Sequence, residues 1–84
     1  MANLYTGTIT LEGYQTITSL TGVSFTKGTT YTFQVFDTVY IREGTTGYGF
    51  KVLPDEKFQW IATDNDLYIG KYNNTNTTII NISE

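Results

Sequence analysis

Apolar and polar residues alternate with a period of two in several short segments of this sequence. The clearest segment is 30–36, where Tyr31, Phe33 and Val35 fall on one side and polar residues fall on the other. Such alternation is typical of a β-strand with one face in the core and the other in solvent. No stretch of about a dozen residues keeps the 3.6-residue apolar period of an amphipathic helix. We therefore expect an all-β protein.

Strand-like segments recur along the whole chain at the spacing of roughly 8–12 residues that β-sandwiches and small barrels show. Gly, Asp and Asn residues bound them, and the only proline, Pro54, is expected at the second position of a turn at 54–57. The predicted strands are 5–11, 15–20, 30–36, 39–42, 48–53, 58–62, 67–71 and 77–82, with a short extended piece at 23–25. We predict one domain over residues 1–84, a small antiparallel β-sandwich of about eight strands, with a small β-barrel as the alternative.

Two parts of the sequence follow one pattern. Residues 33–35 lead through a turn to 39–41, and residues 58–60 lead through a turn to 67–69; both run Phe-Gln-apolar and then apolar-Tyr-Ile. This pattern predicts two similar hairpins that pack face to face or continue one sheet. The alternative is chance similarity among strands that are built from few residue types.

The chain of 84 residues contains no Cys and no His. Disulfides, thiol nucleophiles, Cys/His zinc sites and Ser-His-Asp triads are therefore excluded. Asp64 and Asp66 resemble the start of a calcium loop, but position 68 is Tyr and no Glu closes the loop, so we expect a self-capping turn. No spacing selects a catalytic pair among the eight carboxylates. We expect no enzymatic activity, no metal and no cofactor.

Five basic residues against eight acidic ones give the chain a net charge of −3. The basic residues are scattered along the sequence, so we expect no nucleic-acid groove. No apolar run approaches the roughly 18 residues needed to cross a membrane, and the N-terminal residues lack the pattern of a secretory signal. We expect a complete gene product that is made in the cytoplasm and has no membrane partner.

Aromatic residues that face outward are the candidates for a functional surface. If the aliphatic neighbours of Tyr40 and Tyr68 face the core, the two tyrosine rings face outward. The interface or ligand candidates are Tyr40, Arg42, Tyr48, Trp60, Tyr68 and Tyr72. Tyr, Trp and Arg are enriched at protein interfaces, and aromatic ring faces also stack on sugars. A subunit interface, a sugar platform and ordinary packing are the three alternatives.

Residues 28–84 resemble short all-β proteins that are encoded among phage structural genes. The resemblance lies in a Tyr-rich strand, a Tyr-Ile-Arg-Glu strand with a Gly-rich loop, a Gly-Phe strand before a proline, and a Leu-Tyr-Ile strand. The segments that carry it are 28–35, 39–44, 49–54, 67–69 and 80–84. The resemblance carries over no catalytic residue.

This resemblance implies a virion accessory protein, located in the head decoration, fibre, neck or baseplate. Such proteins bind other virion proteins, often as symmetric homo-oligomers, of which a trimer is one form. A carbohydrate-binding module or host-surface adhesin, with a glycan as partner, is the first alternative. A small acidic inhibitor of a host defence protein is the second, although the acidic residues are scattered in the sequence. A bacterial protein of unrelated role is the third.

Overall fold

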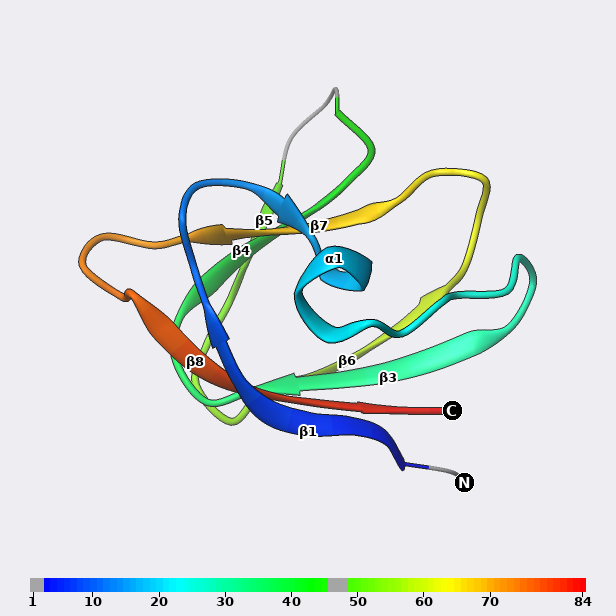
Figure 1. The fold of residues 1–84 in the computed structure, drawn as a ribbon, viewed down its shortest axis with the longest axis horizontal. Coiled ribbons are helices and arrows are strands. Elements are labelled where there is room, and N and C mark those ends of the chain that lie inside the picture. Colours follow the sequence, from blue (N-terminus) through cyan, green and yellow to red (C-terminus); the bar gives the residue numbers. More distant parts are fainter. Residues whose placement is uncertain (1–2, 46–48) are drawn as a thin grey trace.

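The computed structural model describes residues 3–45 and 49–84, and it consists of two four-stranded antiparallel sheets packed face to face (Figure 1). The first sheet has the strand order β1-β8-β3-β6, and the second has the order β2-β7-β4-β5. The strands are β1 (Asn3–Thr10), β2 (Gln15–Thr16), β3 (Thr30–Val35), β4 (Val39–Glu43), β5 (Phe50–Val52), β6 (Lys57–Ile61), β7 (Leu67–Lys71) and β8 (Thr77–Ser83). The prediction of an all-β sandwich of about eight strands is confirmed.

The chain passes back and forth between the two sheets. Among the described strands, only β4 and β5 are neighbours both in sequence and within a sheet. The passage from β5 to β6 uses the turn Leu53–Glu56, which the Glu56 N–H closes by donating to the Leu53 carbonyl at 3.1 Å. Pro54 occupies the second position as predicted, but the turn begins one residue earlier than the predicted turn at 54–57, and Asp55 follows with a φ of 65°. Strands that leave a sheet in this way place sequence-distant segments side by side.

The core lies between the sheets and is formed by the inward residues of the alternating strands. Phe33 at its centre is fully buried, and its ring stacks on Phe58 with centroids 5.0 Å apart and an interplanar angle of 13°. Phe58 is the cross-strand partner of Phe33, and Trp60 is that of Tyr31. Cross-strand aromatic pairs of this kind stabilise a sheet by roughly 0.2–1 kcal/mol each. The other fully buried apolar residues are Ile17, Val35, Val39, Ile41, Val52, Ile69, Ile80 and Ile82.

The structure corrects the prediction of a strand over 15–20. Only Gln15–Thr16 form a strand, and a one-turn helix, α1 (Ile17–Thr21), follows. Thr16 caps the helix, since its Oγ1 accepts a hydrogen bond from the Ser19 N–H at 3.2 Å, and Gly22 ends it with a φ of 81°. The next residues, 23–25, form no strand either. Local capping and the burial of Ile17 therefore decide the conformation here, not the β-propensity of the threonines.

The repeated pattern forms arches, and the prediction of two hairpins is wrong. Strand β3 lies in the first sheet and β4 in the second, and β6 and β7 are divided in the same way. Each strand of one arch pairs with its counterpart in the other, with Phe33 opposite Phe58 and Ile41 opposite Ile69. Equivalent residues therefore face each other in the edge pair β3–β6 of the first sheet and in the central pair β7–β4 of the second.

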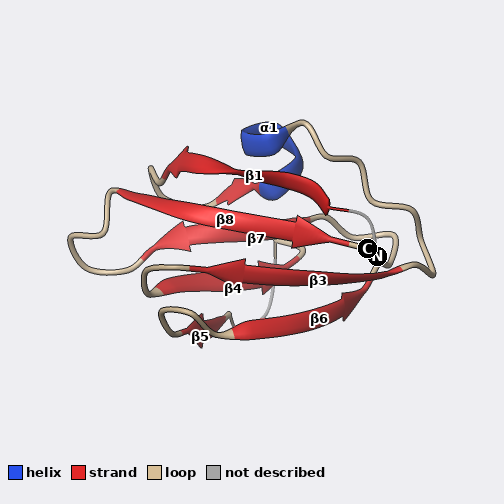
Figure 2. Cartoon of the chain, turned by 90° about the horizontal axis from the view of Figure 1, so that it is seen from below, coloured by secondary structure: helices blue, strands red, loops and turns tan. Residues whose placement is uncertain are grey.

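The two long edges of the sandwich differ. Helix α1 packs against β1, β2 and β7, and it lies along the edge that β1 and β2 form (Figure 2). Strands β5 and β6 form the opposite edge, where Phe50 meets Phe58 at a centroid distance of 5.6 Å. Phe50 is nonetheless 50% exposed. One edge of the core is thus covered by a helix, and the other is open.

Candidate interaction surface

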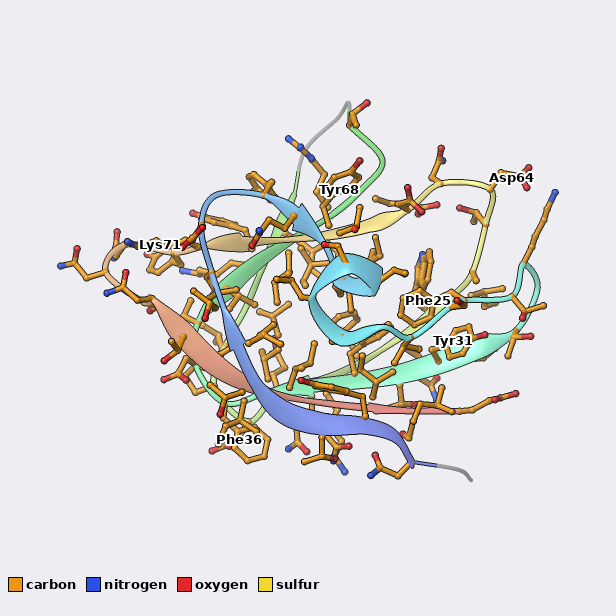
Figure 3. The ribbon with its side chains drawn as sticks, viewed as in Figure 1. Phe25, Tyr31, Phe36, Asp64, Tyr68 and Lys71 are labelled. Carbon is orange, nitrogen blue, oxygen red and sulfur yellow. The ribbon has the colours of Figure 1, made fainter. Side chains whose placement is uncertain are left out.

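Large side chains cover the outer side of the second sheet. Val39, Ile41, Leu67 and Ile69 are buried in the core. Because successive strand residues point to opposite faces, the residues between them face outward. We name the group formed by Tyr14, Tyr40, Arg42, Lys51, Tyr68 and Tyr72 the tyrosine face. Figure 3 shows Tyr68 on this side of the molecule, with Phe36 on the opposite side.

Arg42 is held between two tyrosine rings. Its guanidinium carbon lies 4.2 Å from the centroid of the Tyr14 ring and 5.7 Å from that of the Tyr68 ring. Tyr68 is the cross-strand partner of Arg42, and the Arg42 Nε donates a hydrogen bond to the Gly44 carbonyl at 3.2 Å. A cation over an aromatic face gains roughly 0.5–2 kcal/mol, depending on its exposure. These contacts fix the direction of a side chain that would otherwise be free to move.

Tyr14 lies outside the strands and crosses the face of the sheet. A Cβ atom at Gly70 would stand 2.6 Å from the Tyr14 Cε1, and a Cβ atom at Gly49 would stand 3.2 Å from the Tyr14 hydroxyl. A side chain at position 70 would therefore displace the ring, whereas one at position 49 would require the Tyr14 hydroxyl to move by a few tenths of an ångström. Tyr14 remains 41% exposed, so its outer surface is open to a partner.

The remaining members form a second cluster on the same side. The Tyr40 and Tyr72 rings are 5.1 Å apart at their centroids, with an interplanar angle of 60°. The Lys51 Nζ lies 5.5 Å from the centroid of Tyr72, and Lys51 is also the cross-strand partner of Tyr40. Tyr40 is paired with Gly70 on its other side, so the Tyr14 ring and this cluster adjoin.

The structure brings together four of the six predicted residues: Tyr40, Arg42, Tyr68 and Tyr72. Tyr48 lies outside the described residues. Tyr14 and Lys51 were missed by the sequence analysis. The alternation that placed Tyr40 outward applies equally to Lys51 on β5, and a glycine inside a strand, Gly70, often marks a close approach of another group.

Trp60 lies elsewhere, on the inner side of β6. Its ring packs on Phe25 with centroids 5.5 Å apart, and it lines a hollow of about 280 Å³. Asp64 stands at one end of the molecule, and its Oδ2 lies 3.0 Å from the Lys27 Nζ (Figure 3). Both side chains are largely exposed, so this ion pair contributes less than about 1 kcal/mol. The lining of the hollow is Thr18, Phe25, Lys27, Trp60, Thr63, Asp64, Asn65 and Asp66.

The residue types of the tyrosine face are those enriched at protein interfaces. Two of its members are cationic and none is acidic, although the whole chain carries a charge of −3. A tyrosine combines an apolar ring with a hydroxyl that forms hydrogen bonds, and the planar guanidinium of arginine stacks on rings and donates several hydrogen bonds. Both properties are useful at an interface. Within residues 3–45 and 49–84, no three Asp or Glu side chains gather as a metal site would require. The same part of the chain has no helix long and apolar enough to span a membrane.

Comparison of the chain with models of known protein families, with curated proteins and with solved structures gives no match.

Proposed function

We propose that this protein is a non-enzymatic binding protein that docks the tyrosine face onto another protein, in the setting of a phage virion. The observation that carries the proposal is the pair of adjoining clusters on the outer side of the second sheet, with Tyr14 and Tyr68 around Arg42 and with Tyr40 packed on Tyr72. Tyrosine and arginine are the residue types that most often dominate binding energy at interfaces. The virion setting rests on the resemblance of residues 28–84 to phage structural proteins.

The order already present in the tyrosine face supports this function. Binding loses free energy whenever mobile side chains must be immobilised, by roughly 0.5–1.5 kcal/mol for each. Arg42 and Tyr14 already hold each other, and so do Tyr40 and Tyr72. The face is therefore arranged before a partner arrives. Its two cations on an acidic protein favour a partner surface that is neutral or acidic.

The proposal is tested by counting copies of the chain in purified virions. Infected cells express the wild-type chain, the variant Tyr40→Ser/Tyr68→Ser, or the control variant Thr32→Ser/Gln34→Ser. The control substitutions lie on the outer side of the first sheet. We expect the tyrosine variant to be depleted by roughly thirtyfold, the loss that removal of a binding hot spot causes. The control variant should be incorporated like the wild type.

Quantitative mass spectrometry of the virions gives the copy number, and circular dichroism of each purified variant checks the fold. Absence of the wild-type chain from virions contradicts the virion setting. Equal incorporation of both variants contradicts the role of the tyrosine face.

A second candidate function, glycan binding, is favoured by the hollow beside Trp60. An indole ring there lies together with Asp64, Asn65 and Asp66. Sugars stack their C–H surfaces on such rings, and carboxylates and amides bond their hydroxyl groups. The hollow therefore combines an indole ring with the polar groups that a sugar site needs.

Fluorescence distinguishes this candidate, because Trp60 is the only tryptophan. Titration with a panel of mono- and oligosaccharides would shift or quench the Trp60 emission if a sugar occupied the hollow, and Asp64→Asn would weaken that response. An unchanged emission across the panel counts against glycan binding in this hollow and leaves the tyrosine face as the proposed site.

A further inference from the structure

The open edge of the sandwich carries backbone groups that none of the described strands uses. The Ala62 N–H donates to the Thr29 carbonyl at 3.0 Å, and the Ala62 carbonyl accepts from the Gly28 N–H at 2.8 Å. Hydrogen bonding alternates along an antiparallel strand, so Trp60 and Phe58 also direct their backbone groups toward β3. The backbone groups of Lys57, Gln59 and Ile61 therefore point away from the sheet.

Side chains at this edge are also exposed to an unusual degree for their size. Ile61 on the outer side of β6 is 61% exposed, the largest value among the big apolar side chains of the described residues. Phe50, Phe58 and Trp60 line the inner side, and none of the three is fully buried. An edge strand without proline or bulge that exposes apolar side chains is a template for pairing with another strand. The opposite edge differs because α1 packs there.

The sequence of β6 is complementary to itself. If Gln59 of one copy faces Gln59 of a second copy in an antiparallel pair, Lys57 faces Ile61, and Phe58 faces Trp60. All outward-pointing backbone groups then meet in hydrogen-bonded positions, as the alternation requires. The alkyl stem of Lys57 covers the exposed Ile61, the two Gln59 amides bond each other, and no two like charges face each other. The Phe58–Trp60 pair would extend the aromatic ladder that Tyr31–Trp60 and Phe33–Phe58 already form.

We propose that two copies of this chain pair through β6, antiparallel and centred on Gln59, to join their first sheets into one continuous eight-stranded sheet. We assign the open edge to a second copy of the chain because every favourable side-chain pair described above is formed by two residues of β6. A strand that pairs with itself about a two-fold axis closes as a dimer and leaves no further β6 edge. The proposal does not rest on the function proposed above, because the tyrosine face lies on the other sheet and stays free.

The experiment is light scattering after size exclusion, over a series of protein concentrations. We expect the wild-type chain to reach twice its mass of 9.5 kDa. Ile61→Lys places a cation opposite Lys57 of the second copy, and it should raise the dimer dissociation constant by roughly tenfold or more. Ile61 is exposed, so the fold should survive this change, which circular dichroism checks.

A second variant tests the register. Lys57→Glu/Ile61→Lys sets opposite charges across the same pair, and it should restore the dimer that Ile61→Lys loses. The control, Thr8→Lys, adds a cation to β1 at the other edge and should leave the dimer intact. A wild-type monomer at every concentration, a trimer, a dimer indifferent to Ile61→Lys, or failure of the double variant to restore pairing would each overturn the proposal.

Discussion

On both outer faces of the sandwich, inward and outward residues alternate along the strands. The two faces differ in the kind of side chain that points outward. On the first sheet most outward residues are short and polar, although Ile61 and Ile79 are exposed apolar residues on the same side. We name this side the threonine face: Thr6, Thr8, Thr10, Thr32, Gln34, Thr77, Ile79 and Asn81. On the second sheet the outward residues are those of the tyrosine face. The polar side chains of the threonine face bond each other across neighbouring strands, as when the Thr6 Oγ1 donates to the Oδ1 of its cross-strand partner Asn81 at 3.1 Å.

Solvent exposure alone therefore does not define a binding surface. Short threonines satisfy strand propensity and meet water, but they offer a partner little area. The tyrosines and Arg42 offer large rigid areas, and they order each other through contacts of 4–6 Å between ring centroids or cations. The side chains of the tyrosine face are thus already ordered in the folded chain, so a partner would not have to order them on binding.

The largest expected effect comes from the core that both faces share. Phe33→Ala should lower the free energy of unfolding by about 3–5 kcal/mol, because it removes a fully buried ring from the centre of the aromatic ladder. Phe36→Ala, which removes a ring that is 41% exposed, is the matched control and should have a much smaller effect. Urea denaturation measures both. Equal losses would show that the core is not centred on Phe33.

A smaller loss of stability should follow the removal of Arg42, the cation that packs between Tyr14 and Tyr68. Arg42→Ala should lower the free energy of unfolding by about 1–2 kcal/mol, because it removes the contacts with Tyr14 and Tyr68 as well as the packing of the side-chain stem. Lys27→Ala, which removes a largely exposed cation away from the tyrosine face and from β6, should change it by less than about 1 kcal/mol. Both values come from denaturation curves at one salt concentration. A neutral Arg42→Ala would mean that the tyrosine face is not ordered in solution.

The smallest effect tests whether Gly70 makes room for Tyr14. Gly70→Ala should cost about 1 kcal/mol, because the new methyl group displaces the Tyr14 ring and with it the Arg42 contact. In a Tyr14→Ala background the same substitution should be neutral or stabilising by about 0.5 kcal/mol, since Ala is favoured over Gly in a strand. A double-mutant cycle measures this coupling. Additive effects would contradict the contact.

Outside 15–20, the strands and the sides that their residues face were predictable because apolar and polar residues alternate with a period of two. Tyr31, Phe33 and Val35 are buried as the pattern requires, and Tyr40 and Tyr68 face outward. Helix α1 was not predictable from periodicity, since five residues are too few to show a helical repeat. The arches were missed for a different reason: a turn between two strands does not reveal whether the second strand stays in the same sheet.

The candidate surface was predictable in part. Strand alternation found Tyr40 and Tyr68, and Arg42 was a candidate because of its residue type. Tyr14 lies outside the strands, and only the tertiary fold brings its ring over Gly70. Trp60 shows the opposite case. Its residue type favoured a binding surface, whereas its position in the alternation of β6 puts it on the inner side with Phe58.

The central claim, that the tyrosine face is the binding surface, is tested most directly by hydroxyl-radical footprinting of the chain, free and in the virion. The proposal predicts that the oxidation rates of Tyr14, Tyr40, Tyr68 and Tyr72 fall in the virion, while that of Phe36 on the first sheet stays unchanged. Protection of Phe36 with unchanged tyrosine rates would contradict the claim, because the partner would then lie on the opposite side of the sandwich.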